Sequence, residues 1–192
     1  MVVRARQLGC RRIALLLVLL FAAAGCGEKK KGSPSGSGGA QLLSVHAKGP
    51  PGVAFKVADL PFGTIEIPDG NGWSLEQRGP IEVNGPDGTV VMLQAQDGIT
   101  VEQRDDYLAS YNDVQVRDAP KYQRVAQDVG DVAGAPGARV EGKFDNGTAF
   151  VTRDYLLFKG GKVVIVGGRT PAPGAAQLAP LVDHMAASLR MK

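Results

Sequence analysis

Cysteine and histidine are scarce in this sequence, and their scarcity limits its metal and redox chemistry. The two cysteines both lie in the first 26 of 192 residues: Cys10 falls in the part interpreted below as a signal peptide, and Cys26 is the residue directly after it. No cysteine remains to form a disulfide or a thiolate site in the rest of the chain. The two histidines are His46 and His184, whereas a zinc site needs about three protein ligands. We therefore expect no disulfide, no metal site and no cofactor.

Long apolar runs are also lacking. The run Ile13 to Ala24, "IALLLVLLFAAA", has twelve residues, whereas a helix that spans a bilayer needs about 20. Four arginines and no acidic residue precede this run, and it ends in small residues that continue to Gly25. A basic start, a short apolar stretch and a small-residue end are typical of a cleaved secretory signal peptide.

The residue after this pattern is Cys26, and the stretch resembles the lipobox of bacterial lipoproteins. Ala23 replaces the leucine that is usual three positions before the cysteine. The resemblance implies a diacylglyceryl thioether on Cys26 and cleavage between Gly25 and Cys26. Because Gly27 rather than an aspartate follows, it also implies an outer-membrane, periplasm-facing location in a cell with two membranes. An ordinary secretory signal with an incidental cysteine is the alternative.

Glycine, serine and lysine dominate the segment after Cys26. Residues 28–40, "EKKKGSPSGSGGA", have no apolar residue able to join a core apart from the terminal alanine, and Gly/Ser-rich chains behave as flexible coil. The three lysines at 29–31 either contact anionic head groups or keep the segment solvated. We therefore predict a signal peptide at 1–25, a lipidated cysteine with a flexible tether at 26–51, and a single globular domain at 52–192.

The charge balance excludes nucleic acid as a partner. The chain has 22 basic and 19 acidic residues, but four of the arginines belong to the signal segment. Without them the two signs nearly cancel, whereas a nucleic-acid-binding domain needs a concentrated basic face.

The first half of the globular domain is predicted to hold short strands and one helix. Two apolar alternations, 52–60 and 63–73, are broken by prolines and glycines and are expected to be edge-like strands. A hairpin is expected from Ile81 to Leu93, around the turn residues "NGPDG". A helix is predicted to begin at Thr100, which has capping-box spacing to Gln103, and to end near Asn112. Its apolar face is predicted from three residues: Val101, Leu108 and Tyr111.

The second half has stronger turn signals. Asn146-Gly147 predicts a type I′ turn and Gly160-Gly161 a second hairpin turn, which together give an antiparallel meander. Its last strand, 162–169, is apolar on both sides and is therefore expected to be central in the sheet. A closing helix is predicted with Pro180 in its first turn and His184 on a solvated flank. Its apolar stripe has five members: Leu178, Leu181, Val182, Met185 and Leu189.

This order of elements resembles the PsbP-like and DcrB-like family. Four stretches carry the resemblance: "IPDGNGW", "TVEQRDDYLASY", "FVTRDYLLFKGGKVVIVGG" and "LAPLVDHMAASLR". Together they cover roughly residues 52–190. The resemblance implies an α+β fold in which an antiparallel sheet is flanked by helices as an α/β/α sandwich. It also implies a binding or scaffolding role, and it supplies no active-site residues.

Motifs for catalysis are missing. The sequence has neither the G-x-S-x-G nucleophile elbow nor the G-x-x-x-x-G-K-[ST] phosphate loop. Asp105 and Asp106 are adjacent, so they do not share a helix face for acid–base work. The lone tryptophan, Trp73, is expected to anchor the core, with contact to a ligand as the alternative.

We therefore favour a non-enzymatic lipoprotein that is anchored by Cys26 and presents an interaction or scaffolding domain to an unidentified protein of the bacterial envelope. The first alternative is a carrier of a small apolar ligand or lipid, with a pocket near Trp73. The second is an envelope hydrolase. This would require Asp154, Tyr155 and His184 to lie within hydrogen-bonding reach of one another.

Overall fold

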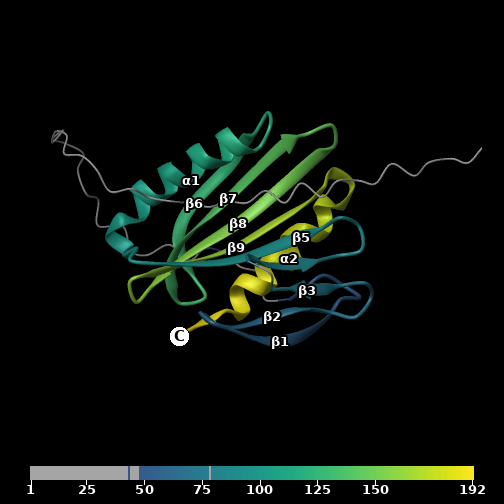
Figure 1. The fold of residues 1–192 in the computed structure, drawn as a ribbon, viewed down its shortest axis with the longest axis horizontal. Helices are drawn as coiled ribbons and strands as arrows, with labels where there is room; N and C mark the ends of the chain where they lie inside the picture. Colours follow the sequence, from purple (N-terminus) through teal and green to yellow (C-terminus); the bar gives the residue numbers. More distant parts are fainter. Residues whose placement is uncertain (1–42, 44–47, 78) are drawn as a thin grey trace, which may run out of the picture. The chain divides into compact units, whose positions relative to one another are not determined.

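The computed structural model describes residues 43, 48–77 and 79–192, all of which belong to one compact unit, Gly38–Lys192. These residues form two antiparallel sheets and two α-helices (Figure 1). The strands are β1 Ala54–Leu60, β2 Gly63–Asp69, β3 Ser74–Glu76, β4 Ile81–Asn84, β5 Val90–Asp97, β6 Gln123–Val132, β7 Ala135–Asp145, β8 Ala149–Lys159, β9 Lys162–Pro171 and β10 Arg190–Met191. The helices are α1 Arg104–Asp118 and α2 Ala175–Ser188.

The larger sheet has seven strands in the order β3-β4-β5-β9-β8-β7-β6. The predicted meander of β7, β8 and β9 and the predicted hairpin of β4 and β5 are confirmed. Gly160 and Gly161 both have positive φ, as a two-residue hairpin turn requires. The predicted type I′ turn at Asn146-Gly147 is wrong, because only Gly147 has positive φ and the loop has three residues.

Strand β9 is the fourth of the seven strands, so its predicted central position is confirmed. Its alternate residues are buried on opposite faces of the sheet. Val163 and Ile165 belong to one apolar core, and Val164 and Val166 belong to the other. The continuous apolar run of this strand therefore reflects burial on both sides.

Helix α1 follows a short 3₁₀ turn, and its predicted start is confirmed by the capping box, in which Thr100 N donates to Gln103 Oε1 at 2.9 Å. The predicted end near Asn112 is wrong. The Asn112 side chain donates to the Leu108 carbonyl, and the helix continues until the residue before Pro120 becomes extended. The predicted apolar face is also wrong at Val101, which is 37% exposed.

Helix α2 buries the predicted apolar stripe against the large sheet and β2, so the amphipathic pattern is confirmed. Pro180 does not lie in the first turn. The helix begins at Ala175, so Pro180 falls in its second turn and removes the hydrogen bond to the carbonyl of Ala176.

The smaller sheet has the order β1-β2-β10 and was not predicted from the sequence. Strand β2 lies in its middle rather than at an edge, because the last strand of the chain pairs with it at Gly63 and Thr64. The chain end is held further by Lys192, whose backbone N–H donates to the Phe62 carbonyl at 3.1 Å and whose Nζ lies 2.7 Å from Asp59.

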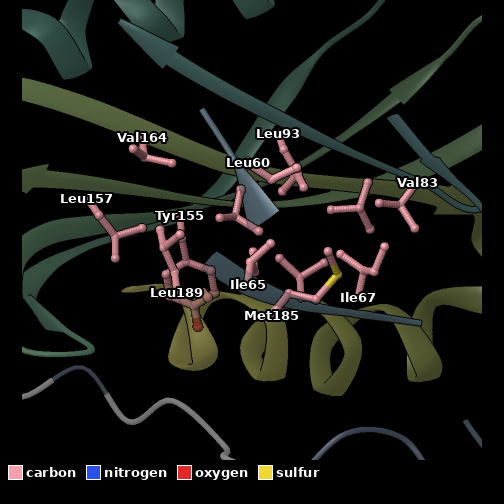
Figure 2. Packing of buried hydrophobic residues seen from close by; sticks show 14 of the residues in the cluster. Leu60, Ile65, Ile67, Val83, Leu93, Tyr155, Leu157, Val164, Met185 and Leu189 are labelled. Atoms are coloured by element: carbon pink, nitrogen blue, oxygen red, sulfur yellow. The ribbon is translucent and has the colours of Figure 1, made fainter. Parts of the chain in front are cut away.

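The first apolar core lies between the two sheets and is closed by α2. Figure 2 shows Ile65 and Ile67 of β2 facing side chains of the large sheet such as Leu93, with Met185 of α2 beside them. The second core lies on the opposite face of the large sheet, under α1, and contains Tyr107, Leu108 and Tyr111 with residues of β7, β8 and β9. The predicted fold class, an α+β antiparallel sheet flanked by helices, is confirmed.

The predicted signal peptide and lipobox, with Gly25 and Cys26, lie outside the described residues. Leu43 of the predicted tether is described. Its backbone N–H donates to the Asp131 carbonyl at 3.2 Å, and its side chain packs on the first core. The domain boundary at residue 52 stays a prediction.

Candidate functional site

Two groups of ionisable side chains lie on opposite faces of the large sheet, because successive residues of a strand point to opposite faces. On β8, Arg153 and Tyr155 face α2, whereas Thr152 and Asp154 face α1. The charged groups on the α2 face are paired with one another, whereas the buried carboxyl group on the α1 face has no cationic partner. The candidate site lies on the α1 face.

The α2 face carries a row of paired charges that we call the charged ladder. Its members are Asp128 of β6, Arg139 and Glu141 of β7, Arg153 and Tyr155 of β8, and Asp183 of α2. The innermost member is Asp183, which has no solvent exposure. Arg153 donates to both of its carboxylate oxygens, at 2.6 and 2.9 Å, and the Tyr155 hydroxyl donates to Oδ1 at 2.7 Å.

The ladder continues outward with alternating sign. Arg153 also donates to Glu141, and Arg139 Nε lies 3.5 Å from the same carboxylate. Arg139 then donates to Asp128 at 2.5 and 3.2 Å. Every charged member of the ladder therefore has an opposite charge beside it, as a buried ion pair requires.

Two donors of the ladder, Arg153 and Tyr155, keep their protons at neutral pH. Desolvation lowers the pKa of Arg153, but the hydrogen bond to Asp183 and the surrounding negative charges outweigh it, so the pKa lies above its ordinary value. Burial raises the pKa of Tyr155 to about 12, and the hydrogen bond to Asp183 adds to this shift. Because Arg153 and Tyr155 of the sheet both donate to Asp183 of α2, the ladder fastens α2 to the sheet.

The α1 face holds a carboxyl group without a cationic partner. Asp154 is 6% exposed and accepts a hydrogen bond from Tyr111 of α1. Burial raises its pKa to about 7, although the Tyr111 hydrogen bond lowers it in part. Its Oδ1 atom lies against Gly167 of β9, where a Cβ atom would come within 2.8 Å of it. Asp154 is therefore a buried group that exchanges its proton near neutral pH.

Three further buried polar atoms near α1 have no hydrogen bond of normal geometry within the described residues. They are Asn112 Oδ1, Tyr122 OH and Thr152 Oγ1. The Tyr122 ring covers Gly142 of β7, where a Cβ atom would lie 2.6 Å from the phenol oxygen. Burial raises the pKa of Tyr122 to about 12, so its hydroxyl stays protonated. Polar groups on this face are less completely paired than those of the ladder.

Part of this face is not covered by α1. Six half-buried residues of β4, β5, β8 and β9, which we call the open face, lie on the α1 side of the sheet: Glu82, Asn84, Val90, Met92, Thr152 and Arg169. Their side is fixed by register, since Gly167 pairs with both Asp154 and Met92. Among the described residues, Val90 and Met92 belong to neither apolar core. In Figure 1, α1 lies over the β6 and β7 side of the sheet.

Trp73 lies between β2 and β3 and is partly buried against the first core. Its backbone N–H donates to the Gly70 carbonyl at 2.9 Å, and its ring lies against Gly85, where a Cβ atom would be 2.7 Å away. This packing is that of a core anchor. Contact of Trp73 with a ligand stays a prediction.

The three residues required for a hydrolase are not brought together. Asp154 and Tyr155 point to opposite faces of the large sheet. His184 lies on α2, with Nε2 2.6 Å from Glu66 of β2 and its ring 4.1 Å from that of Phe55. The predicted solvated flank position of His184 is also wrong, because its side chain is only 16% exposed.

The sequence interpretation missed the charged ladder. Asp183 follows two apolar residues of the α2 stripe, and a carboxylate so close to a buried stripe indicates a buried partner of opposite charge. Arg153 and Glu141 lie directly across from each other on β7 and β8. Finding this pair would have required the strand register in addition to the sequence.

Within residues 43, 48–77 and 79–192, no three His, Cys, Asp or Glu side chains are grouped so that they could hold a metal ion. In the same part of the chain, no helix has the length and apolar character needed to cross a membrane.

Comparison with known proteins identifies the fold. No protein-family model matches the sequence, and no curated protein matches it. The structure is similar to that of a protein from Bacteroides thetaiotaomicron, at 15% identity and a TM-score of 0.52. That match covers 71% of this chain and 48% of the Bacteroides chain, so this chain spans about half the length of that relative.

Two further solved structures are similar. The cyanobacterial PsbP of Synechocystis sp. PCC 6803 matches at 12% identity and a TM-score of 0.51, over 81% of this chain and 99% of that one. LpqN of Mycobacterium tuberculosis, described as involved in cell envelope biogenesis, matches at 14% identity and a TM-score of 0.47, over 73% and 92%. At these identities the similarity shows the fold alone, and that fold is PsbP-like.

Proposed function

We propose that this protein is a non-enzymatic lipoprotein of the bacterial envelope, whose PsbP-like domain binds another envelope protein through the open face. The observation that carries this proposal is the unequal covering of the large sheet. Its α2 side is closed by a helix and a second sheet, whereas its α1 side leaves Val90, Met92 and Arg169 half-exposed together. Methionine and arginine are enriched in protein interfaces relative to the rest of a protein surface.

The arrangement of ionisable groups supports a binding role over a catalytic one. The charged ladder is closed on itself, and Asp154 lies under α1 with a tyrosine as its hydrogen-bond partner. A general base needs a reacting group within hydrogen-bond distance, and none of the three residues considered for hydrolysis faces another.

Site-specific photo-crosslinking in living cells tests the binding role. A photoreactive amino acid at Glu82, on the open face, is expected to give a discrete cross-linked product in the envelope fraction. The matched control places the same amino acid at Val57, which is 68% exposed on β1 of the other sheet. Equal products from both positions, or none from Glu82, would overturn the proposal.

The anchoring part of the proposal rests on Cys26 and its surroundings. A twelve-residue apolar run, small residues before the cysteine and a Gly/Ser segment after it all agree with lipidation. Two or more acyl chains, at about 0.8 kcal/mol per buried methylene, hold a protein stably on a membrane. In a cell with two membranes the expected location is the outer membrane, facing the periplasm.

Metabolic labelling with a palmitate analogue, combined with detergent partition, tests the anchor. The unchanged protein is expected to take up label and to enter the detergent phase. Cys26→Ser is expected to abolish the label and to leave the signal peptide uncleaved by the lipoprotein peptidase. A labelled Cys26→Ser protein that migrates as the mature form would contradict the assignment.

A further inference from the structure

Arg169 differs from the other arginines of the domain in having no partner. Six arginines within the described residues form side-chain hydrogen bonds or ion pairs: Arg104, Arg117, Arg124, Arg139, Arg153 and Arg190. Among the same residues, the Arg169 guanidinium forms no hydrogen bond, ion pair or ring contact. It is also half-buried, so it is not simply extended into solvent.

The neighbours of Arg169 explain why its charge is not balanced. Its cross-strand neighbours are Thr152 on β8 and Val90 on β5, and neither carries a charge. The carboxyl nearest in register is that of Asp154, which faces Gly167 and is hydrogen-bonded to Tyr111. Partial burial of a cation without a counter-ion is unfavourable, and a bound anion would relieve that cost.

The surroundings also indicate the kind of anion. The backbone groups of β9 are paired with β5 and β8 along this stretch, so the donors that remain are side chains. They are the Arg169 guanidinium and, beside it, the Thr152 hydroxyl, which forms no hydrogen bond of normal geometry among the described residues. A guanidinium binds a carboxylate through two parallel hydrogen bonds. Apart from Thr152, the adjacent side chains are apolar: Val90, Met92 and Phe150. Phe150 stacks on Phe144 with ring centroids 5.0 Å apart.

We infer that Arg169 is a binding residue for a carboxylate carried on an apolar group, which lies on Val90, Met92 and Phe150. This inference rests on the proposed binding function and names the chemistry recognised at the open face. The carboxylate is assigned to an acidic side chain of that protein partner, and the probes below separate it from a free organic acid.

The test uses residues 26–192 with Cys26→Ser, which contain both apolar cores and all the strands and helices described. Amide ¹H–¹⁵N spectra are recorded during titration with 4-phenylbutyrate and, separately, with the blocked peptide N-acetyl-Phe-Glu-Phe-amide. The uncharged controls are 4-phenylbutyramide and the same peptide with glutamine. The carboxylates are expected to shift signals of β5, β8 and β9 around Arg169, and the amides are not.

Variants separate the charge from the fold. Arg169→Gln is expected to weaken carboxylate binding by about tenfold or more, as loss of a charge-assisted hydrogen bond does. Arg169→Lys keeps the positive charge but lacks the two parallel N–H donors of the guanidinium. Its affinity for the carboxylates is expected to lie between those of the wild type and Arg169→Gln. Arg124→Gln removes an exposed arginine that is already bonded to Gln127, and it is expected to change binding less than about twofold.

The titrations can either support or overturn the carboxylate site at Arg169. Tighter binding of the peptide than of 4-phenylbutyrate supports a protein partner as the source of the carboxylate, and tighter binding of 4-phenylbutyrate would overturn that assignment. Equal shifts with the amides, shifts that map elsewhere, or unchanged binding by Arg169→Gln would overturn the carboxylate site. A cross-linked product from Glu82 without any carboxylate binding would leave the proposed function standing and reject only this inference.

Discussion

The two faces of the large sheet differ in how their buried charged and polar side chains are paired. On the α2 side, the completely buried Asp183 is balanced by Arg153 and by the Tyr155 hydroxyl, and the surrounding core is closed by a second sheet. On the α1 side, Asp154 has one tyrosine hydroxyl and no cation, and part of the sheet lies uncovered beside it. The charges of the α2 face are therefore balanced within the domain, whereas the α1 face retains buried polar groups that are not fully paired.

The largest expected effect comes from breaking the charged ladder at its buried end. Asp183→Ala leaves Arg153 and Tyr155 facing a gap in the core, and removal of one partner from a buried ion pair costs about 3–5 kcal/mol. Urea unfolding at pH 7 measures this loss. Asp128→Ala, at the end of the ladder where the side chain is 43% exposed, is the control and should cost less than about 1 kcal/mol. Equal losses would show that the ladder does not depend on burial.

The second prediction tests whether the apolar cores on the two faces of the large sheet contribute equally to stability. Leu156 and Leu157 are adjacent on β8 and almost fully buried, the first under α1 and the second in the core that α2 closes. Each substitution by alanine should lower the free energy of unfolding by about 2–5 kcal/mol. If Leu156→Ala were close to neutral in urea unfolding, the α1 face would be a loosely packed cover rather than a core.

The third prediction concerns Asp154 and pH. Its pKa of about 7 in the folded protein exceeds the ordinary value of 3.8, so the folded state binds a proton more tightly than the unfolded state. The stability that this adds is complete below about pH 4 and is lost as pH rises through 7. Asp154→Asn stays neutral at every pH and removes this loss, which is at most about 4 kcal/mol.

Urea unfolding of the wild-type protein and Asp154→Asn between pH 4 and pH 8 measures the effect. The difference between the two proteins isolates this group from other carboxyls, such as Asp145, whose pKa is lowered by a backbone hydrogen bond and by Lys121. The variant should gain stability relative to the wild type as pH rises. A difference that does not change with pH would contradict the assignment.

The smallest expected effect lies at the start of the helix that covers the α1 face. Gln103→Ala removes the side chain that accepts from the Thr100 backbone N–H and should destabilise the protein by about 1 kcal/mol. Asp113→Ala, at an exposed position further along α1, is the control. Thermal unfolding is the measurement, and an unchanged midpoint for Gln103→Ala would show that the capping box adds nothing to stability.

Sequence patterns predicted the features that depend on interactions between residues close together in the sequence. The Gly160-Gly161 turn, the capping box at Thr100 and the apolar stripe of α2 each depend on residues less than a dozen positions apart, and all three were found. The end of α1 was missed because Asn112 bonds to the Leu108 carbonyl and to Gln127, and the second of these contacts is tertiary.

The site was less predictable than the fold. The sheet formed by β1, β2 and β10 joins residues more than a hundred positions apart, and so does the pair of Glu66 with His184. The lack of a partner for Arg169 can be recognised only after the register has placed Thr152 and Val90 beside it. A pattern of residue types does not contain such information, because it depends on which strands become neighbours.

The pairing of the last strand with β2 has a consequence for the time at which the domain can fold. Strand β2 is made early, but its partner β10 and most of the side chains that cover it from α2 come from the last residues of the chain. The core between the two sheets therefore cannot be completed until α2 and β10 have been made, more than a hundred residues after β2. Until then the apolar side chains of β2 have no helix to pack against, so the first core is the later of the two to close during synthesis.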